Sequence, residues 1–319
     1  MKAILHCGTF KTGSTTIQNT AYYNRGALRK SNIIYPSTGI DLRAEKDNGE
    51  IGFRHSRFAY EYGSSNYSQL LKQLGKEIDK ANCSTLFISA EPWSNPRTAY
   101  SLNSMVEHLK KVGFTEIRGM VFIRNIHDYM VRHYREWVRR HGASQNFSEY
   151  IIAQKFFFDY LTICKNITKA LQGNVGFLNF DKISDVNEFT FSQLDVDYHS
   201  LKLPPRANEG LSCIDVEIIR ILNQYGLRIN DLPDSASLLS NFGLCAHENA
   251  FSEKLPSGLM DIFDSKYIRE FSSLTGIQES ESKEIFKNRE KPGIDILTAS
   301  PILEKVTLEW LKLKKIGAA

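Results

Sequence analysis

The chain has 319 residues, of which 42% are hydrophobic and 24% are charged, and its formal net charge is +4. This composition is typical of a soluble globular protein. The small positive charge favours an anionic ligand but is far below that of a nucleic-acid-binding protein, so we expect no nucleic-acid partner. The longest apolar stretch, residues 150–164, contains charged and amide side chains, and we expect no transmembrane segment.

The cellular compartment follows from two further features. The five cysteines are scattered and show no CxxC spacing, so we expect reduced, unpaired thiols. No secretory signal is visible, because Lys2 is followed by only a few apolar residues before the sequence turns polar. Together these features predict a cytoplasmic protein.

The first predicted elements are a strand over residues 2–7 and a helix over residues 14–30, joined by a loop that contains Gly8 and Gly13. A strand, a glycine-spaced loop and a helix N-terminus in this order present backbone N–H groups to a phosphate. The glycine spacing is that of a Walker A loop, but Ser14 stands where that loop has its lysine. The lysine lies inside the loop instead, at Lys11, which argues for a phosphate ligand other than a nucleoside triphosphate with magnesium.

Further strands and helices alternate along the chain. This alternation predicts an α/β fold with a central parallel sheet and helices on both faces, followed by a mainly helical C-terminal part. We expect an α/β core over residues 1–235 and a helical extension packed on it over residues 236–319, or one continuous domain. The remaining strands are expected at residues 32–35, 85–89, 117–123 and 175–180, and the main helices at residues 67–81, 98–112, 125–134, 147–171, 211–224 and 302–313.

Polar residues follow two of the predicted strands, and others lie in a long connection. Glu91 comes after the third strand and Arg124 closes the fourth. Because parallel strands end at the sheet edge where ligands bind, both are candidates for a site. The polar connection over residues 41–65, which includes His55, is long enough to be functional.

Two segments carry a resemblance to a known family. The run Lys11-Thr12-Gly13-Ser14-Thr15 resembles the 5′-phosphosulfate-binding loop of the sulfotransferases that use 3′-phosphoadenosine 5′-phosphosulfate (PAPS). The segment from Arg124 to Tyr134 resembles that family's second signature, in which an arginine closing a strand and a serine eight residues later hold the 3′-phosphate. Here Arg132 occupies the position of that serine.

A third segment, Arg206-Ala207-Asn208 ahead of a helix that ends in Leu222-Asn223, is similar to one in bacterial members of the family. The resemblance as a whole implies a P-loop fold, PAPS as the sulfuryl donor, 3′-phosphoadenosine 5′-phosphate (PAP) as the product, and no metal. It implies a glycan, lipid or small-alcohol acceptor and, since no anchor is visible, a bacterial type of enzyme. The nucleotide-binding residues carried over are Lys11, Thr12, Gly13, Ser14, Thr15, Thr16, Arg124, Arg132 and Arg206.

Sulfuryl transfer also needs a base close to the acceptor hydroxyl. Glu91 is the favoured candidate, since related animal enzymes carry a catalytic histidine at the end of an equivalent strand, and His55 is the alternative. Lys11 is assigned to catalysis as well as binding. Three other interpretations stay open: an ion pair of Arg124 with Asp128, a P-loop kinase acting on ATP or GTP, and a non-catalytic nucleotide binder.

Overall fold

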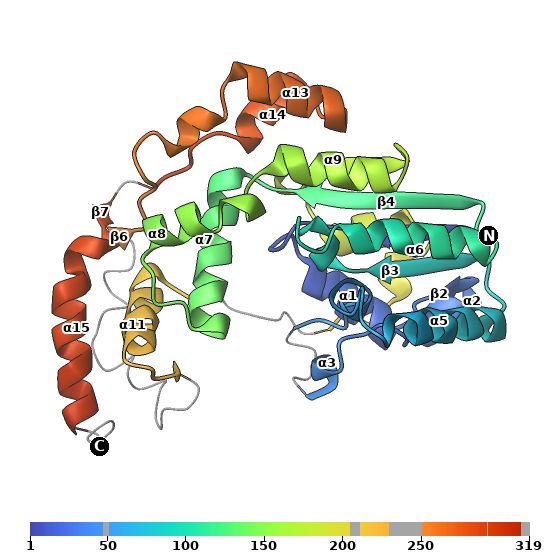
Figure 1. Cartoon of the computed structure of the whole chain (residues 1–319), viewed down its shortest axis with the longest axis horizontal. Coiled ribbons are helices and arrows are strands. Elements are labelled where there is room, and N and C mark those ends of the chain that lie inside the picture. Colours follow the sequence, from blue (N-terminus) through green and yellow to red (C-terminus); the bar gives the residue numbers. More distant parts are fainter. Residues whose placement is uncertain (47–50, 205–210, 230–250, 292, 314–319) are drawn as a thin grey trace. The chain divides into compact units, whose positions relative to one another are not determined.

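The structure is a computed structural model that describes residues 1–46, 51–204, 211–229, 251–291 and 293–313 (Figure 1). These residues belong to two compact units, each discontinuous in sequence. The predicted boundary between residues 235 and 236 falls outside the described residues and stays a prediction. The first unit is Met1–Asn125, Asp159–Asn208 and Phe263–Ile285, and the second is Ile126–Phe158, Glu209–Ile262 and Phe286–Ala319.

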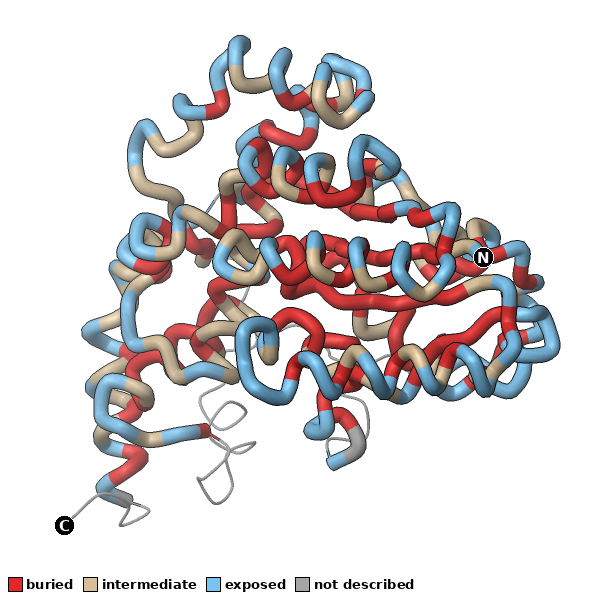
Figure 2. The backbone as a smooth tube through the Cα atoms, turned by 45° about the vertical axis from the view of Figure 1, so that its right-hand side comes forward, coloured by how far each residue is buried: buried red, intermediate tan, exposed pale blue. Residues whose placement is uncertain are grey.

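A five-stranded parallel sheet forms the centre of the first unit, which confirms the predicted fold class. The strand order is β2-β3-β1-β4-β5, so the first strand of the sequence lies in the middle of the sheet. Figure 2 shows that the central strands are almost entirely buried. The strands are β1 (Lys2–His6), β2 (Ile33–Ile34), β3 (Thr85–Ser89), β4 (Glu116–Ile123) and β5 (Val175–Asn179).

Helices surround this sheet, and one predicted helix is divided. The expected helix over residues 14–30 breaks at Asn24, whose side-chain amide donates to the carbonyls of Thr20 and Lys202, both at 2.8 Å. The helices of the first unit are α1 (Ser14–Tyr23), α2 (Arg25–Lys30), α3 (Arg43–Lys46), α4 (Arg57–Tyr60), α5 (Tyr67–Ala81), α6 (Tyr100–Lys111), α9 (Tyr160–Ala170), α10 (Val186–Ser192), α13 (Ser265–Thr275) and α14 (Glu279–Ile285).

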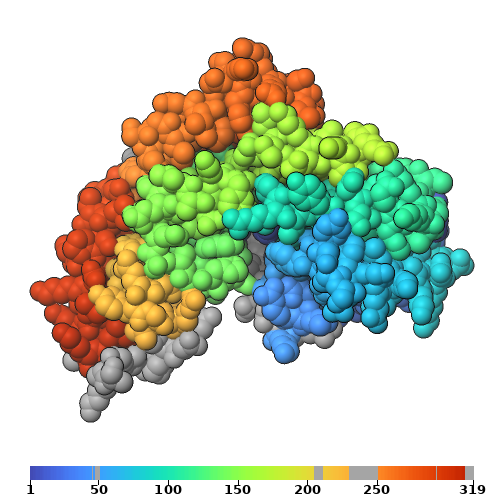
Figure 3. Space-filling model, in the orientation of Figure 1, coloured from blue at the N-terminus to red at the C-terminus, as the bar shows by residue number. Residues whose placement is uncertain are grey.

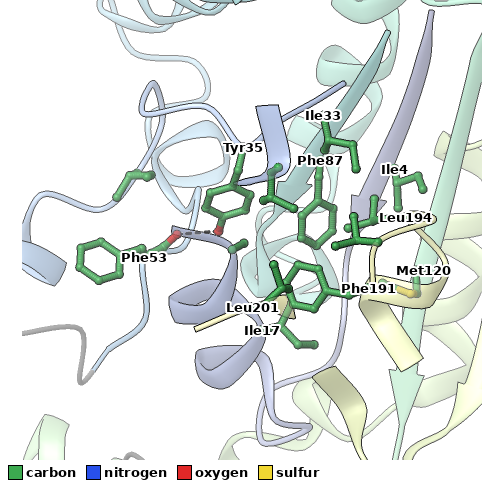
Figure 4. Close-up of a cluster of buried hydrophobic side chains, with 14 of the residues drawn as sticks. Ile4, Ile17, Ile33, Tyr35, Phe53, Phe87, Met120, Phe191, Leu194 and Leu201 are labelled. Carbon is green, nitrogen blue, oxygen red and sulfur yellow. Dashed lines mark hydrogen bonds between the residues drawn. The ribbon is translucent and has the colours of Figure 1, made fainter. Parts of the chain in front are cut away.

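Both faces of the sheet are buried, as the nearly continuous apolar strands require. On one face Ile4 and Phe87 pack with Ile17 of α1 and Phe191 of α10 (Figure 4). Neighbouring residues point to the other face because side chains alternate along a strand, and Leu5 is fully buried there. In the space-filling view, side chains of α5 and α6 form part of the visible surface of this unit (Figure 3).

The second unit is mainly helical. An internal ion pair stabilises it: Arg220 donates to both carboxylate oxygens of Glu217, at 2.7 and 2.8 Å, and to the carbonyl of Ser144 at 3.0 Å. The predicted helix over residues 147–171 is divided between the two units, and Asp159 caps the start of α9. The elements are α7 (Ile126–Glu136), a π-helical turn (Trp137–His141), α8 (Phe147–Ala153), α11 (Cys213–Gln224), α15 (Ile296–Leu313), β6 (Phe251–Ser252) and β7 (Ile294–Asp295).

Within the part of the chain that the structure describes, no helix is both long and apolar enough to cross a membrane. The four described cysteines are all buried and form no disulfide, and the fifth, Cys245, lies outside the described residues.

The core of the first unit generates a stability prediction. The Tyr35 hydroxyl donates to the carbonyl of Phe53 at 2.7 Å (Figure 4), which attaches the connection between β2 and α4 to the core. Tyr35→Phe leaves this buried carbonyl unpaired, so we expect a loss of about 1–3 kcal/mol in the free energy of unfolding, measured by urea denaturation. Tyr100→Phe, at a residue that is 74% exposed, is the control. Equal losses in the two variants would contradict the proposed anchor.

Candidate functional site

The strand order creates a topological switch point between β1 and β4. The chain leaves β1 towards β2 and leaves β4 towards β5, so the connections that follow these two neighbouring strands diverge. In open α/β sheets, ligands bind at the carboxyl ends of strands where this divergence occurs. Residues 7–13 follow β1 and Arg124 follows β4, so both lie at this position.

The loop over residues 7–13 remains attached to β4 beyond the end of β1. The Cys7 amide donates to the carbonyl of Met120 at 2.9 Å, and the Thr9 hydroxyl donates to the carbonyl of Phe122 at 3.0 Å. The backbone then turns sharply, with Lys11 at φ 66°. A left-handed conformation costs a non-glycine residue roughly 1–2 kcal/mol, so neighbouring groups must hold Lys11 in place.

Arg124 is one of these neighbouring groups. Its Nη1 donates to the carbonyl oxygen of Lys11 at 2.5 Å, and its Nη2 lies 3.8 Å from Oδ1 of Asp181, at the end of β5. Asp181 is thus an acidic partner of Arg124, and Asp128 pairs with Arg289 at 3.1 Å. Arg124 is only 7% exposed, and its partly buried contact to Lys11 links the end of β4 to the loop.

The first turn of α1 lacks both a capping side chain and an acidic residue. Its N-cap, Gly13, has φ 77° and no side chain to accept a hydrogen bond, and the first turn contains no acidic residue. The Ser14 hydroxyl is buried, and it has no hydrogen-bond partner among the described residues. Thr15 and Thr16 are half-buried in the same turn. Since the first N–H groups of a helix lack internal partners and carry partial positive charge, this turn is suited to binding an anion.

Glu91 lies next to this loop. The amide of Ala90 donates to the carbonyl of His6 at 2.9 Å, so β3 and β1 stay paired to their ends and Glu91 follows directly. Its side chain is 5% exposed. One carboxylate oxygen accepts a hydrogen bond from Gln18 Nε2 of α1 at 2.8 Å. A carboxylate thus follows β3 at the sheet edge where the loop over residues 7–13 follows β1.

His55 is fully buried and contacts the backbone through both ring nitrogens. Nδ1 accepts from the amide of Ser89 at 3.2 Å, so Nε2 carries the proton and donates to the carbonyl of Pro36 at 2.9 Å. Burial lowers the pKa of His55 to about 4, which keeps the ring neutral. The backbone of His55 also donates to Ser89, so this histidine attaches the connection before α4 to the end of β3.

The roles of two residues carried over from the family stay predictions. Arg132 is exposed on α7 of the second unit, and Arg206 lies outside the described residues. Among the described residues, no group of three or more His, Cys, Asp or Glu is arranged to hold a metal ion.

Two residues that contact the candidate site residues, Asp181 and Gln18, were not predicted from the sequence. A signal for Asp181 was its place just after the last strand, which ends at the same sheet edge. A signal for Gln18 was its spacing of four residues from Ser14, which puts both on one face of the helix.

No protein-family model and no curated protein matches the chain. The crystal structure of a sulfotransferase from Alicyclobacillus acidocaldarius is similar to the chain, with a TM-score of 0.39 and 12% sequence identity, over 89% of this chain and 99% of that one.

The buried histidine generates a pH prediction. Below about pH 6.5 the unfolded chain takes up a proton at position 55 that the folded protein excludes down to about pH 4, so the free energy of unfolding falls as the pH falls through this window. His55→Gln removes up to about 1.4 kcal/mol per pH unit of this dependence, as measured by urea denaturation at several pH values. His199→Gln, at an exposed position, is the control. If the free energy of unfolding depends on pH in the same way in His55→Gln and in the wild type, His55 is not held neutral in the folded protein.

Proposed function

We propose that the chain is a sulfotransferase that moves the sulfuryl group of PAPS to a hydroxyl or amine of an acceptor, a glycan or glycolipid. The observation that carries the proposal is the loop after β1, where Arg124 holds the carbonyl of Lys11 and the buried Ser14 hydroxyl lacks a partner. PAPS supplies an activated sulfuryl group on its 5′-phosphate, and transfer leaves PAP.

The loop residues are assigned to the 5′-phosphate. The partnerless Ser14 hydroxyl fits a phosphate oxygen at the start of α1, and the backbone around Gly13 and the hydroxyl of Thr15 supply further donors. Thr12 supports the turn, since its hydroxyl donates to the carbonyl of Thr9 at 2.7 Å. Lys11 neutralises the charge that grows on the leaving oxygen, which in enzymes of this kind is worth about 10²- to 10³-fold in rate per donor.

The 3′-phosphate is assigned to Arg124. A guanidinium group carries five N–H donors in a planar fork that suits phosphate oxygens, and Arg124 already holds the carbonyl of Lys11 in the loop. Arg132 and Arg206 are proposed as additional donors, with Arg132 in place of the family's serine.

The base is assigned to Glu91. Its position beside the loop is that of a group that accepts the proton of an acceptor hydroxyl as the hydroxyl attacks sulfur. His55 is the weaker candidate, because its N–H and its ring lone pair are both used by backbone groups.

Nucleotide binding tests the assignment of the loop. Titration calorimetry is expected to give tighter binding of PAP than of ATP with Mg²⁺. Lys11→Ala is expected to weaken PAP binding at least about tenfold, since it removes a charged hydrogen-bond donor. Lys72→Ala, at an exposed lysine of α5, is the control. Preferential binding of ATP with Mg²⁺ would point instead to a P-loop kinase.

Transfer from ³⁵S-labelled PAPS to a panel of glycans, glycolipids and small alcohols tests the chemistry. With an accepted substrate, Lys11→Ala and Glu91→Gln are each expected to lower kcat by about 10²- to 10³-fold, since each removes a group that acts in the transition state. Glu91→Gln should bind PAP as the wild type does. PAP binding without transfer to any member of the panel would identify a non-catalytic nucleotide binder.

A further inference from the structure

A chain of four buried polar side chains connects β1, β3 and α1 next to the candidate site. His6 Nδ1 lies 2.7 Å from the Ser89 hydroxyl, Gln18 Nε2 lies 3.0 Å from the same hydroxyl, and Gln18 Nε2 also lies 2.8 Å from Oε2 of Glu91. His6, Ser89 and Gln18 are fully buried, and Glu91 is 5% exposed. Buried polar groups in such a chain have few alternative partners, so each fixes the next.

The donor and acceptor capacities of the four groups are consistent with one direction for each hydrogen bond. The Glu91 carboxylate only accepts, so the Gln18 amide must turn its NH₂ group towards Glu91 and give its second hydrogen to Ser89. The Ser89 hydroxyl then donates its own hydrogen to His6 Nδ1. Burial lowers the pKa of His6 to about 3, so the ring is neutral and able to accept there.

The position of Gln18 on α1 links this chain to the anion-binding turn. Ser14 and Gln18 are four residues apart and therefore lie on the same face of the helix. The Ser14 hydroxyl is at the first turn, and Gln18 holds Glu91 one turn later. One rigid helix thus carries a contact to the donor nucleotide and a contact to the base.

We propose that Gln18 is the positioning residue of Glu91, and that Ser89 and His6 fix the orientation of the Gln18 amide. This inference rests on the proposed function, because Glu91 is the base only in that reaction. An in-line displacement needs the attacking oxygen, the sulfur and the leaving oxygen in a row, so the base must stay at a fixed distance from the 5′-phosphate site. A displacement of about 1 Å costs such a reaction on the order of 10²-fold in rate.

The test uses Gln18→Met, which keeps the shape of the side chain and removes the amide. We expect kcat to fall about 10- to 100-fold while the Kd of PAP changes less than about twofold. In a protein that already carries Glu91→Gln, the same substitution should lower kcat no further. Ser89→Ala should lower kcat by less than Gln18→Met does, again with little change in the Kd of PAP. Ser89→Thr, which keeps a hydroxyl, should restore activity.

Thr20→Val is the matched control. Thr20 is a fully buried residue of α1, and its hydroxyl accepts from Asn187 at 3.1 Å, outside the chain that leads to Glu91. We expect Thr20→Val to lower stability without lowering kcat. Equal losses of kcat in Gln18→Met and Thr20→Val, or a loss in Gln18→Met that adds fully to that of Glu91→Gln, would overturn the positioning role.

A stability cycle separates this inference from the proposed function. Gln18→Met, Glu91→Gln and the double variant are compared by urea denaturation, which needs no turnover. Non-additive losses are expected for two hydrogen-bonded residues, and additive losses would overturn the contact itself. If the variants show coupled losses of stability but the wild-type protein transfers no sulfuryl group, the contact between Gln18 and Glu91 stands. The proposed function is then overturned, and with it the catalytic role of Gln18.

Discussion

The hydrogen bond from Arg124 to the carbonyl of Lys11 is the contact on which the candidate site depends. Lys11 occupies a left-handed backbone conformation that is unfavourable for a residue with a side chain. A short, charge-assisted and partly buried hydrogen bond compensates for part of this cost. The conformation of the loop after β1 is therefore tied to the residue that closes β4, and both ends of the proposed nucleotide site are set by one contact.

The fold explains why these two residues meet. β1 lies at the centre of the sheet with β4 beside it, and the loop after β1 keeps backbone contacts to β4 as far as Phe122. Arg124 follows two residues later. On the opposite side of β1, the pairing with β3 continues to Ala90 and leaves Glu91 next to the loop. The sheet register thus places the proposed anion-binding turn between the residues that follow β4 and β3, a cation and a carboxylate.

Much of this arrangement could be predicted from local sequence patterns. The alternation of predicted strands and helices predicted the parallel sheet, which the structure confirms, because each element depends on residues that are close in the sequence. The phosphate loop after β1, predicted from its glycine spacing and hydroxyl residues, stays a prediction. The contacts that position the side chains could not be predicted in this way. Arg124 and Lys11 are 113 residues apart, and Gln18 and Glu91 are 73 residues apart, so only the folded sheet brings them together. The break of the first helix at Asn24 has the same cause, because one of its partners is Lys202.

One crystal structure can test whether the 5′-phosphate binds at the first turn of α1. A crystal structure of the protein with PAP bound is predicted to place the 5′-phosphate at the first turn of α1, with the Ser14 hydroxyl and the Lys11 ammonium group within hydrogen-bond distance of its oxygens. A nucleotide bound elsewhere, or a 5′-phosphate that leaves the Ser14 hydroxyl without a partner, would contradict it.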